Sequence, residues 1–258
     1  MNYTKKFSLK GKTVFVIGGS GLIGSEICNA TAELGSKVIN IDNVKNNKNL
    51  KYKKNIFFYK FDISKVNQLE RNYVKLIKKH GIPDIFINSS YPKTKDWKNN
   101  SFKKIKYSSF NENIKIHLNT FSWLAKLVAD SMVKKNISGS IIQLSSIYGI
   151  VGQNLEIYKG TKMAESMSYS VIKGGINNLT RQMASYYGKY NIRINSVCAG
   201  GVFDYQNKLF LKNYKKIAPL KRLAKTDEIA STVAFLSSDA SSYITGSMIM
   251  VDGGWTAI

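Results

Sequence analysis

Short apolar runs alternate along the chain with longer stretches in which apolar residues recur at helical spacing. The apolar runs predict strands at 13–17, 37–41, 55–61, 85–88, 140–144, 193–197 and 247–251. The helical spacing predicts helices at 23–34, 64–80 (capped by Ser64), 110–135, 169–190 and 226–236. Strands that alternate with helices are typical of parallel βαβ units. The pattern therefore predicts an α/β fold, a doubly wound, mostly parallel seven-stranded sheet with helices on both faces.

Length and composition predict one globular domain. The chain has 258 residues, of which 43% are hydrophobic, and no linker-like stretch divides it, so we expect a single domain over residues 1–258. The first ten residues lack the apolar block of a signal peptide, and nowhere do eighteen apolar residues follow one another. We therefore expect a cytoplasmic protein without a membrane partner.

Cysteine and histidine are scarce. Cys28 and Cys198 lie far apart without the spacing of metal ligands, and the only histidines are His80 and His117. We therefore expect neither a disulfide framework nor a metal site. Both cysteines are expected to be small buried hydrophobic residues.

The formal net charge of +23 at pH 7 raises nucleic acid, an acidic membrane surface or an anionic substrate as partners. Lysine supplies nearly all of this charge, and the lysines are spread along the chain apart from one cluster at 45–54. Such a distribution is typical of a solvated surface. We expect no nucleic-acid partner, whereas an anionic substrate stays open.

A glycine-rich turn follows the first strand directly and precedes a helical pattern. Its sequence is Gly18-Gly19-Ser20-Gly21-Leu22-Ile23-Gly24. Glycines at 18, 21 and 24 permit a tight turn and bring backbone N–H groups close to a pyrophosphate, and a helix N-terminus favours negative charge. A nucleotide triphosphate loop would need Gly-Lys-Ser/Thr, which does not follow. The turn therefore indicates a Rossmann-type dinucleotide site, with Gly18, Ser20, Gly21, Leu22, Ile23 and Gly24 as candidate contacts.

Asp42 stands at the end of the second predicted strand. A carboxylate there can accept hydrogen bonds from the adenosine ribose hydroxyls and repels a 2′-phosphate, which favours NAD over NADP. Two features oppose this reading: Lys45 and Lys48 could reach such a phosphate, and aspartate is common in solvated turns. On balance the sequence predicts NAD as the cofactor.

Tyr169 and Lys173 lie four residues apart at the start of a predicted helix, so both project from one face. A nearby ammonium lowers the pKa of a phenol, which can then exchange a proton with an alcohol or a carbonyl as hydride moves. Tyr158 and Lys162 repeat the spacing. Choosing Tyr158 would carry Gly160 into the first turn of the helix, at a cost of about 1 kcal/mol relative to alanine. The glycine counts against Tyr158, but the spacing alone does not choose between the two pairs.

In their order along the chain, these residues resemble the single-domain branch of the short-chain dehydrogenases/reductases. The resemblance covers essentially the whole chain. It rests on the glycine-rich turn, Asp62-Ile63, Asn88, Ser145-Ser146, Tyr169-Ser-Val-Ile-Lys173, Ile192-Arg-Ile-Asn195, Ala199-Gly200-Gly201, Thr245-Gly246 and Val251-Asp252-Gly253-Gly254.

The resemblance implies a role for each of these residues. Tyr169 would be the general acid/base, Lys173 would lower its pKa and bind the nicotinamide ribose, and Ser146 would orient the substrate oxygen. The implied cofactor contacts further along the chain are Asp62 and Ile63 at the adenine, Asn88 after the fourth strand, and Gly200, Gly201 and Val202 near the nicotinamide. The resemblance also implies a mobile substrate lid over 202–218 and a homo-oligomer, a tetramer or a dimer, that pairs the helices at 110–135 and 169–190.

Several positions depart from the family pattern. Ile17, Gly21 and Ala199 differ from the usual residues, and Ser-Ser-Tyr follows Asn88 in place of Ala-Gly. His117 stands where the family's catalytic asparagine is expected. Two interpretations stay open: the imidazole holds a water of the proton relay, or it is a packing residue. Ser146 and Tyr169 are also further apart than usual, because a segment around 153–168 is inserted.

Within the family, the Ser-Ser-Ile-Tyr-Gly stretch and the insert are similar to members encoded with genes for bacterial surface sugars, such as nonulosonate and flagellin-glycan pathways. This implies an NAD-dependent exchange between a secondary alcohol and a ketone on a polyhydroxy or acidic sugar derivative. One alternative is an NADPH-dependent reductase of 3-oxoacyl-thioesters or other carbonyls, and another is a dinucleotide-binding sensor or scaffold whose chemistry has decayed. A serine hydrolase is disfavoured, because the Gly-x-Ser-x-Gly elbow is absent.

Overall fold

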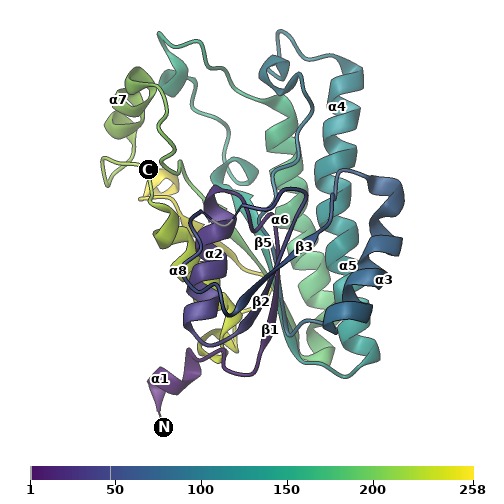
Figure 1. Ribbon diagram of the computed structural model, residues 1–258. Helices are drawn as coiled ribbons and strands as arrows, with labels where there is room; N and C mark the ends of the chain where they lie inside the picture. Colours follow the sequence, from purple (N-terminus) through teal and green to yellow (C-terminus); the bar gives the residue numbers. More distant parts are fainter. Residues whose placement is uncertain (1, 47) are drawn as a thin grey trace.

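The structure is a computed structural model that describes residues 2–46 and 48–258, and at its centre lies a parallel sheet (Figure 1). Its seven strands are β1 (Thr13–Ile17), β2 (Lys37–Asp42), β3 (Ile56–Lys60), β4 (Ile85–Asn88), β5 (Gly139–Ser146), β6 (Ile192–Ala199) and β7 (Met248–Val251). They are arranged in the order β3-β2-β1-β4-β5-β6-β7, and every neighbouring pair is parallel. The predicted doubly wound, seven-stranded sheet is confirmed.

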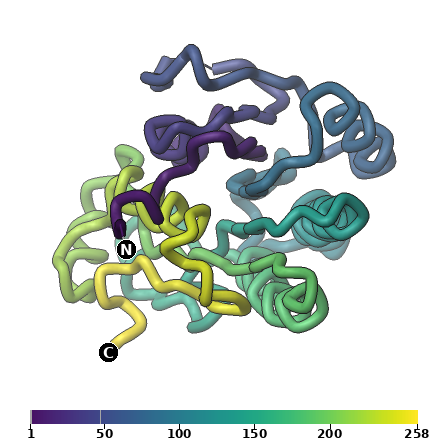
Figure 2. The backbone as a smooth tube through the Cα atoms, turned by 90° about the horizontal axis from the view of Figure 1, so that it is seen from below, coloured from purple at the N-terminus to yellow at the C-terminus, as the bar shows by residue number. Residues whose placement is uncertain are grey.

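Helices cover both faces of the sheet. The helices α2 (Leu22–Glu33) and α8 (Thr226–Ser237) pack together on one face. On the other face lie α3 (Leu69–His80), α5 (Thr120–Lys134) and α6 (Met167–Tyr187), which Figure 2 shows as coils side by side. The remaining helices are α1 (Tyr3–Lys6), α4 (Tyr107–Asn113) and α7 (Lys208–Ile217). No helix in the described part of the chain is both long and apolar enough to span a bilayer.

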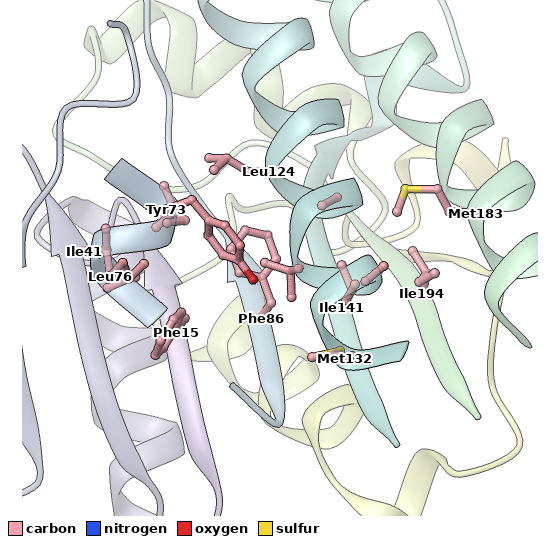
Figure 3. Close-up of a cluster of buried hydrophobic side chains, with 14 of the residues drawn as sticks. Phe15, Ile41, Tyr73, Leu76, Phe86, Leu124, Met132, Ile141, Met183 and Ile194 are labelled. Carbon is pink, nitrogen blue, oxygen red and sulfur yellow. The ribbon is translucent and has the colours of Figure 1, made fainter. Parts of the chain in front are cut away.

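The strands are continuous apolar runs because both of their faces are buried. Phe15 of β1 points into the core beneath α3 and α5, whereas its neighbours Val14 and Val16 point into the core beneath α2 and α8. Figure 3 shows the first of these cores, where Phe86 of β4 and Ile141 of β5 lie close to side chains of α5. Two packed faces hold the carboxyl ends of the strands in fixed positions.

The helix predicted at 110–135 is wrong as a single element. A π-helical turn, Ile114–Asn119, separates α4 from α5. The Thr120 hydroxyl donates to the carbonyl oxygens of Ile116 at 2.8 Å and His117 at 3.0 Å, so this side chain stabilises backbone groups within the irregular turn. Apolar periodicity does not reveal the insertion of a single residue into a helix.

The predicted capping role of Ser64 is also wrong. Its hydroxyl donates to Oδ1 of Asp62 at 2.6 Å, and a 3₁₀ turn, Val66–Gln68, precedes α3. Gln68 is the N-cap residue of α3. The aspartate two residues earlier captures the serine in a local turn, which removes it from the helix end. The predicted inward face of this helix is confirmed, since Leu69, Tyr73 and Leu76 are buried.

Two segments cover the substrate side of the sheet at the carboxyl ends of the strands. The insert contains a 3₁₀ helix, Leu155–Tyr158, and the segment expected as a lid contains α7. They pack on each other, with Ile157 in one apolar cluster with Phe210 and Tyr214. Figure 1 shows α7 and α4 toward the same end of the molecule.

Candidate active site

The strand order reverses between β1 and β4, and the chain leaves the two strands in opposite directions there. In doubly wound sheets such a switch point opens a crevice at the carboxyl ends of the strands. A cleft of about 590 Å³ lies there. Its lining includes the predicted residues Gly18, Gly21, Leu22, Ile23, Gly24, Asp42, Asp62 and Ile63, together with Ser64, Ser89, Ser90, Tyr91 and Lys93.

The glycine-rich turn at the floor of the cleft tolerates no side chain at two positions. Gly18 has a φ of +76°, and a Cβ there would lie 2.7 Å from the Cα of Ser90. A Cβ on Gly24 would collide with the carbonyl oxygen of Gly18. The helix α2 begins immediately after Gly21, which has no side chain to cap it. Its first N–H groups are therefore free to meet an anion, as predicted.

Asp42 lies at the far end of the same cleft. Its Oδ2 accepts a hydrogen bond from the backbone N–H of Ser20 at 3.1 Å, and its Oδ1 accepts from that of Asn43 at 2.8 Å. These bonds fix the carboxylate beside the glycine-rich turn. Ser20 thus contributes by holding Asp42, although it does not belong to the cleft lining described above.

Asn88 ends β4 beneath the cleft and is completely buried. Its Oδ1 accepts from the hydroxyl of Ser90 at 2.7 Å, whereas its Nδ2 has no partner among the described residues. A buried amide without a partner is costly, so it indicates a ligand or water acceptor. The glycine-rich turn, the N-terminus of α2 and the side-chain amide of Asn88 together fit a bound dinucleotide.

Ser146, Tyr169 and Lys173 come together at the carboxyl ends of β5 and β6. Ser146 is the last residue of β5, and Tyr169 and Lys173 occupy the first two turns of α6. The hydroxyl of Ser166 caps this helix by accepting from the N–H of Tyr169 at 3.4 Å. The Nζ of Lys173 lies 5.5 Å from the centre of the Tyr169 ring and donates to the carbonyl of Leu144 at 2.8 Å.

Burial dominates the proton equilibria of this cluster. It raises the pKa of Tyr169, although a hydrogen bond with Ser146 opposes the rise, and it lowers the pKa of Lys173 to about 7. The expected lowering of the phenol pKa by Lys173 is not found. Burial of the phenol outweighs the effect of Lys173, whose Nζ is directed at the carbonyl oxygen of Leu144.

His117 lies in the π-helical turn and is fully buried next to this cluster. Its ring packs against Tyr91 and Phe121, with centroid distances of 5.5 and 5.1 Å. Burial, followed by the charge of Lys173, holds its pKa well below the usual value. Neither ring nitrogen has a partner within the described chain. The imidazole is therefore neutral, and it has one donor and one acceptor to offer.

Tyr158 lies outside the helix that carries Tyr169. It ends the 3₁₀ helix of the insert, and Gly160 has a φ of +74°, which α-helical backbone does not adopt. Its hydroxyl donates to Oε1 of Gln153 at 3.2 Å, and Nε2 of Gln153 donates to the carbonyl of Ser166 at 2.8 Å. The insert is thus tied to the N-terminus of α6.

Gly200 and Val202 follow β6, on the side of the sheet where α7 lies. A Cβ on Gly200 would lie 2.9 Å from the Cα of Asp252, so the chain passes close to the residues after β7. The N–H of Gly201 donates to the hydroxyl of Tyr214 in α7 at 2.8 Å, and Val202 forms an isolated bridge with Ala224. The segment after β6 is thereby coupled to the expected lid.

Sequence reasoning missed Tyr91 and Trp97 as site residues. The Tyr91 ring lies 5.7 Å from that of Tyr169 and 5.5 Å from that of Trp97. A signal was present, because Tyr91 follows a strand end at the switch point, where ligand contacts gather. Among the described residues no group of His, Cys, Asp and Glu side chains has the arrangement of a metal site.

Several known proteins of similar sequence and structure are named as reductases or dehydrogenases. A family model described as enoyl-(acyl carrier protein) reductase matches residues 20–256. The post-translational flagellin modification protein A of Campylobacter coli is 34% identical over 254 residues, which cover 96% of this chain and 99% of that protein. The 3-oxoacyl-[acyl-carrier-protein] reductase FabG of Buchnera aphidicola is 30% identical over 95% of this chain and 98% of its own length.

A short-chain dehydrogenase of Leptospira borgpetersenii, solved with bound NAD+, superimposes with a TM-score of 0.86 at 29% identity. The match covers 99% of this chain and 96% of that one. The extent of these matches, added to the geometry of the cleft, establishes that the chain belongs to the short-chain dehydrogenase/reductase family and is an oxidoreductase of that family.

Proposed function

We propose that this protein uses NAD to interconvert a secondary alcohol and a ketone on a sugar or a sugar-derived substrate. The observation that carries the proposal is the cluster of Ser146, Tyr169 and Lys173. It lies beside a cleft that is lined by the glycine-rich turn and Asp42. In an alcohol–ketone conversion the dinucleotide exchanges a hydride, and a protein side chain exchanges a proton. The cleft provides a place for the first, and the cluster beside it provides a group for the second.

The residues divide the reaction between them. The glycine-rich turn and the N-terminus of α2 hold the pyrophosphate, Asp42 accepts from the adenosine ribose, and Asp62 and Ile63 border the adenine. Bound NAD supplies the acceptor or donor of the hydride. Ser146 donates a hydrogen bond to the substrate oxygen, and the Tyr169 hydroxyl exchanges the proton with it. Lys173 favours the phenolate whenever it carries charge, and it would bind the ribose of the nicotinamide.

His117 is proposed to hold a water that returns the proton to Tyr169 through Lys173. Its two ring nitrogens, which have no partner in the part of the chain that the structure describes, lie near Lys173 and support this role. The packing of its ring on Tyr91 and Phe121 supports the alternative, a purely structural histidine.

The proposed cofactor and substrate class are supported by contacts in the structure and by similarity to known proteins. The fixed carboxylate of Asp42 opposes a 2′-phosphate, and the Leptospira relative contains NAD+. The similarity to a flagellin modification protein and the resemblance to members associated with surface sugars support a sugar derivative. A second candidate, reduction of a 3-oxoacyl-thioester, is favoured by the FabG relative.

One experiment separates these functions. Titration of the protein with NADH and NADPH, followed by cofactor fluorescence, should show tighter binding of NADH. Turnover is then measured on a panel of sugars, sugar acids and 3-oxoacyl-thioesters. Equal affinity for the two cofactors contradicts the role of Asp42, and turnover of thioesters without turnover of sugars favours the second candidate.

We also propose a cytoplasmic single-domain homo-oligomer, a tetramer or a dimer, that pairs α5 and α6. Large apolar side chains are exposed on these helices, among them Trp123, Val171 and Tyr186. Exposed large apolar side chains on neighbouring helices are compatible with an interface. Light scattering at micromolar concentration should give a multiple of the chain mass, and a monomeric mass contradicts the proposal.

A further inference from the structure

We propose that Tyr91 and Trp97 form an aromatic wall that selects a cyclic substrate, and that Lys93 at its edge pairs with an anionic group on that substrate. The inference rests on the proposed function, because it specifies the substrate class of the same site. No feature of the hydride chemistry itself requires these three residues.

The aromatic wall stands beside the phenol that handles the proton. The rings of Tyr91 and Trp97 lie 5.7 and 6.4 Å from that of Tyr169, each nearly perpendicular to it. Tyr91 lines the cleft and remains 44% exposed. Burial of apolar surface stabilises by about 25 cal/mol per Å², and the exposed part of the Tyr91 ring does not have this stabilisation while no substrate is bound. A substrate ring that packs on this surface would recover it, and two fixed aromatic rings at an interplanar angle of 79° fit a rigid ring better than a flexible chain.

The segment that carries the wall is fixed at both ends. The N–H of Thr94 donates to Oδ1 of Asn113 in α4 at 3.0 Å. The carbonyl of Asn100 accepts from the N–H of Met167 at 3.0 Å, and its side chain accepts from the hydroxyl of Ser168. Asn100, Asn113 and Ser168 are all buried. The wall is therefore held against the first turn of α6 before a substrate binds, which reduces the entropy cost of binding.

Positive charge lies beside the aromatic wall. The Nζ of Lys93 lies 5.5 Å from the centre of the Tyr91 ring, and Lys93 lines the cleft. Lys95 and Lys98 are exposed on the same segment. Asp96 is the only acidic residue between 92 and 107, and its carboxylate already accepts from the hydroxyl of Ser109 at 3.0 Å. A carboxylate or phosphate on the substrate would meet Lys93 while its ring lies on Tyr91.

Three probes test ring and charge separately. Methyl β-D-glucuronide is cyclic and anionic, methyl β-D-glucoside is cyclic and neutral, and gluconate is open and anionic. Binding is measured by calorimetry at low ionic strength, with saturating NAD and with Tyr169→Phe as the parent so that no turnover occurs. We expect the glucuronide to bind at least about tenfold more tightly than either of the others, since one charged hydrogen bond contributes about that much.

Variants of the parent assign the two preferences. Tyr91→Ala and Trp97→Ala should each reduce the advantage of the glucuronide over gluconate. Lys93→Gln should remove its advantage over the glucoside, and the matched control Lys103→Gln, in the same basic segment but outside the cleft lining, should not. Gluconate that binds as tightly as the glucuronide, variants that change neither preference, or a parent that binds none of the probes would each overturn the inference.

Failure of the proposed function gives a different result. If Tyr169 does not handle the proton, the Tyr169→Phe parent will reduce NAD in the presence of a substrate that the wild type oxidises. That outcome is read from NADH absorbance and does not depend on the ring preference measured by calorimetry.

Discussion

The candidate active site has two ends that are built in different ways. At the cofactor end, backbone positions dominate: Gly18 and Gly24 leave no room for a side chain, and Asp42 is held by backbone N–H groups. At the catalytic end, side chains dominate: Tyr169 and Lys173 lie among aromatic rings, and neither ring nitrogen of His117 has a partner among the described residues. The first end is indicated by short sequence signals, although its contacts also join distant segments. The second end depends on distant segments and has no comparable short signal.

The largest expected effect lies at the catalytic end. Tyr169→Phe should reduce turnover by roughly 10²- to 10⁴-fold at saturating cofactor, because it removes the group that exchanges the proton. Tyr158→Phe is the matched control: it loses one hydroxyl in the insert and should mainly change the apparent substrate affinity. Near-normal turnover in Tyr169→Phe together with collapse in Tyr158→Phe would reverse the assignment.

The same contrast explains how far the sequence allowed prediction. All seven strands and the glycine-rich turn could be predicted, because apolar runs and glycine spacing are local signals. The π-helical turn around His117 could not, because one inserted residue leaves the apolar pattern almost unchanged. Tyr91 and Trp97 were missed because their proximity to Tyr169 depends on the anchors at Asn100 and Asn113, which pair across distant parts of the chain.

A second prediction concerns the pH dependence of stability that the burial of Lys173 causes. Burial lowers the pKa of Lys173 to about 7, from the 10.5 of an exposed lysine. Between these pH values the unfolded chain binds a proton that the folded chain lacks, so this group makes the protein more stable as pH rises from 7 to 10.5. Its contribution to the slope is at most about 1.4 kcal/mol per pH unit, and it vanishes below pH 7.

Lys173→Met should remove this contribution. The difference in the free energy of unfolding between variant and wild type, measured by urea denaturation from pH 6 to 10, should be largest at low pH. It should shrink as pH rises above 7. A difference that does not change with pH would mean that Lys173 stays charged in the folded protein.

At the cofactor end we expect a smaller and more selective effect. Asp42→Ala should weaken NAD binding by roughly tenfold or more, because a charged hydrogen bond contributes about 1.5 to 3 kcal/mol. The variant also loses the bonds from Ser20 and Asn43, so the decisive quantity is the ratio of NAD to NADP affinity within one protein. That ratio should fall in Asp42→Ala, and an unchanged ratio would leave Asp42 a structural role only.

The smallest effect distinguishes the two interpretations of His117. Its low pKa keeps the imidazole neutral, so it can hold a water much as an amide does. If it belongs to the relay, His117→Asn should retain most of the turnover, whereas His117→Leu should lose much of it. Comparable rates in the two variants would leave only the packing against Tyr91 and Phe121.

A stability measurement checks the neutral state of His117 independently of turnover. Because its pKa is lowered in the folded protein, the unfolded chain takes up a proton first as the pH falls below 6.5, and stability is lost in that range. Both His117→Asn and His117→Leu lack this group, so both should lose less stability than the wild type between pH 6.5 and 5. If turnover distinguishes the two variants while their stability at neutral pH is alike, the relay role is favoured, because packing would then contribute equally to both.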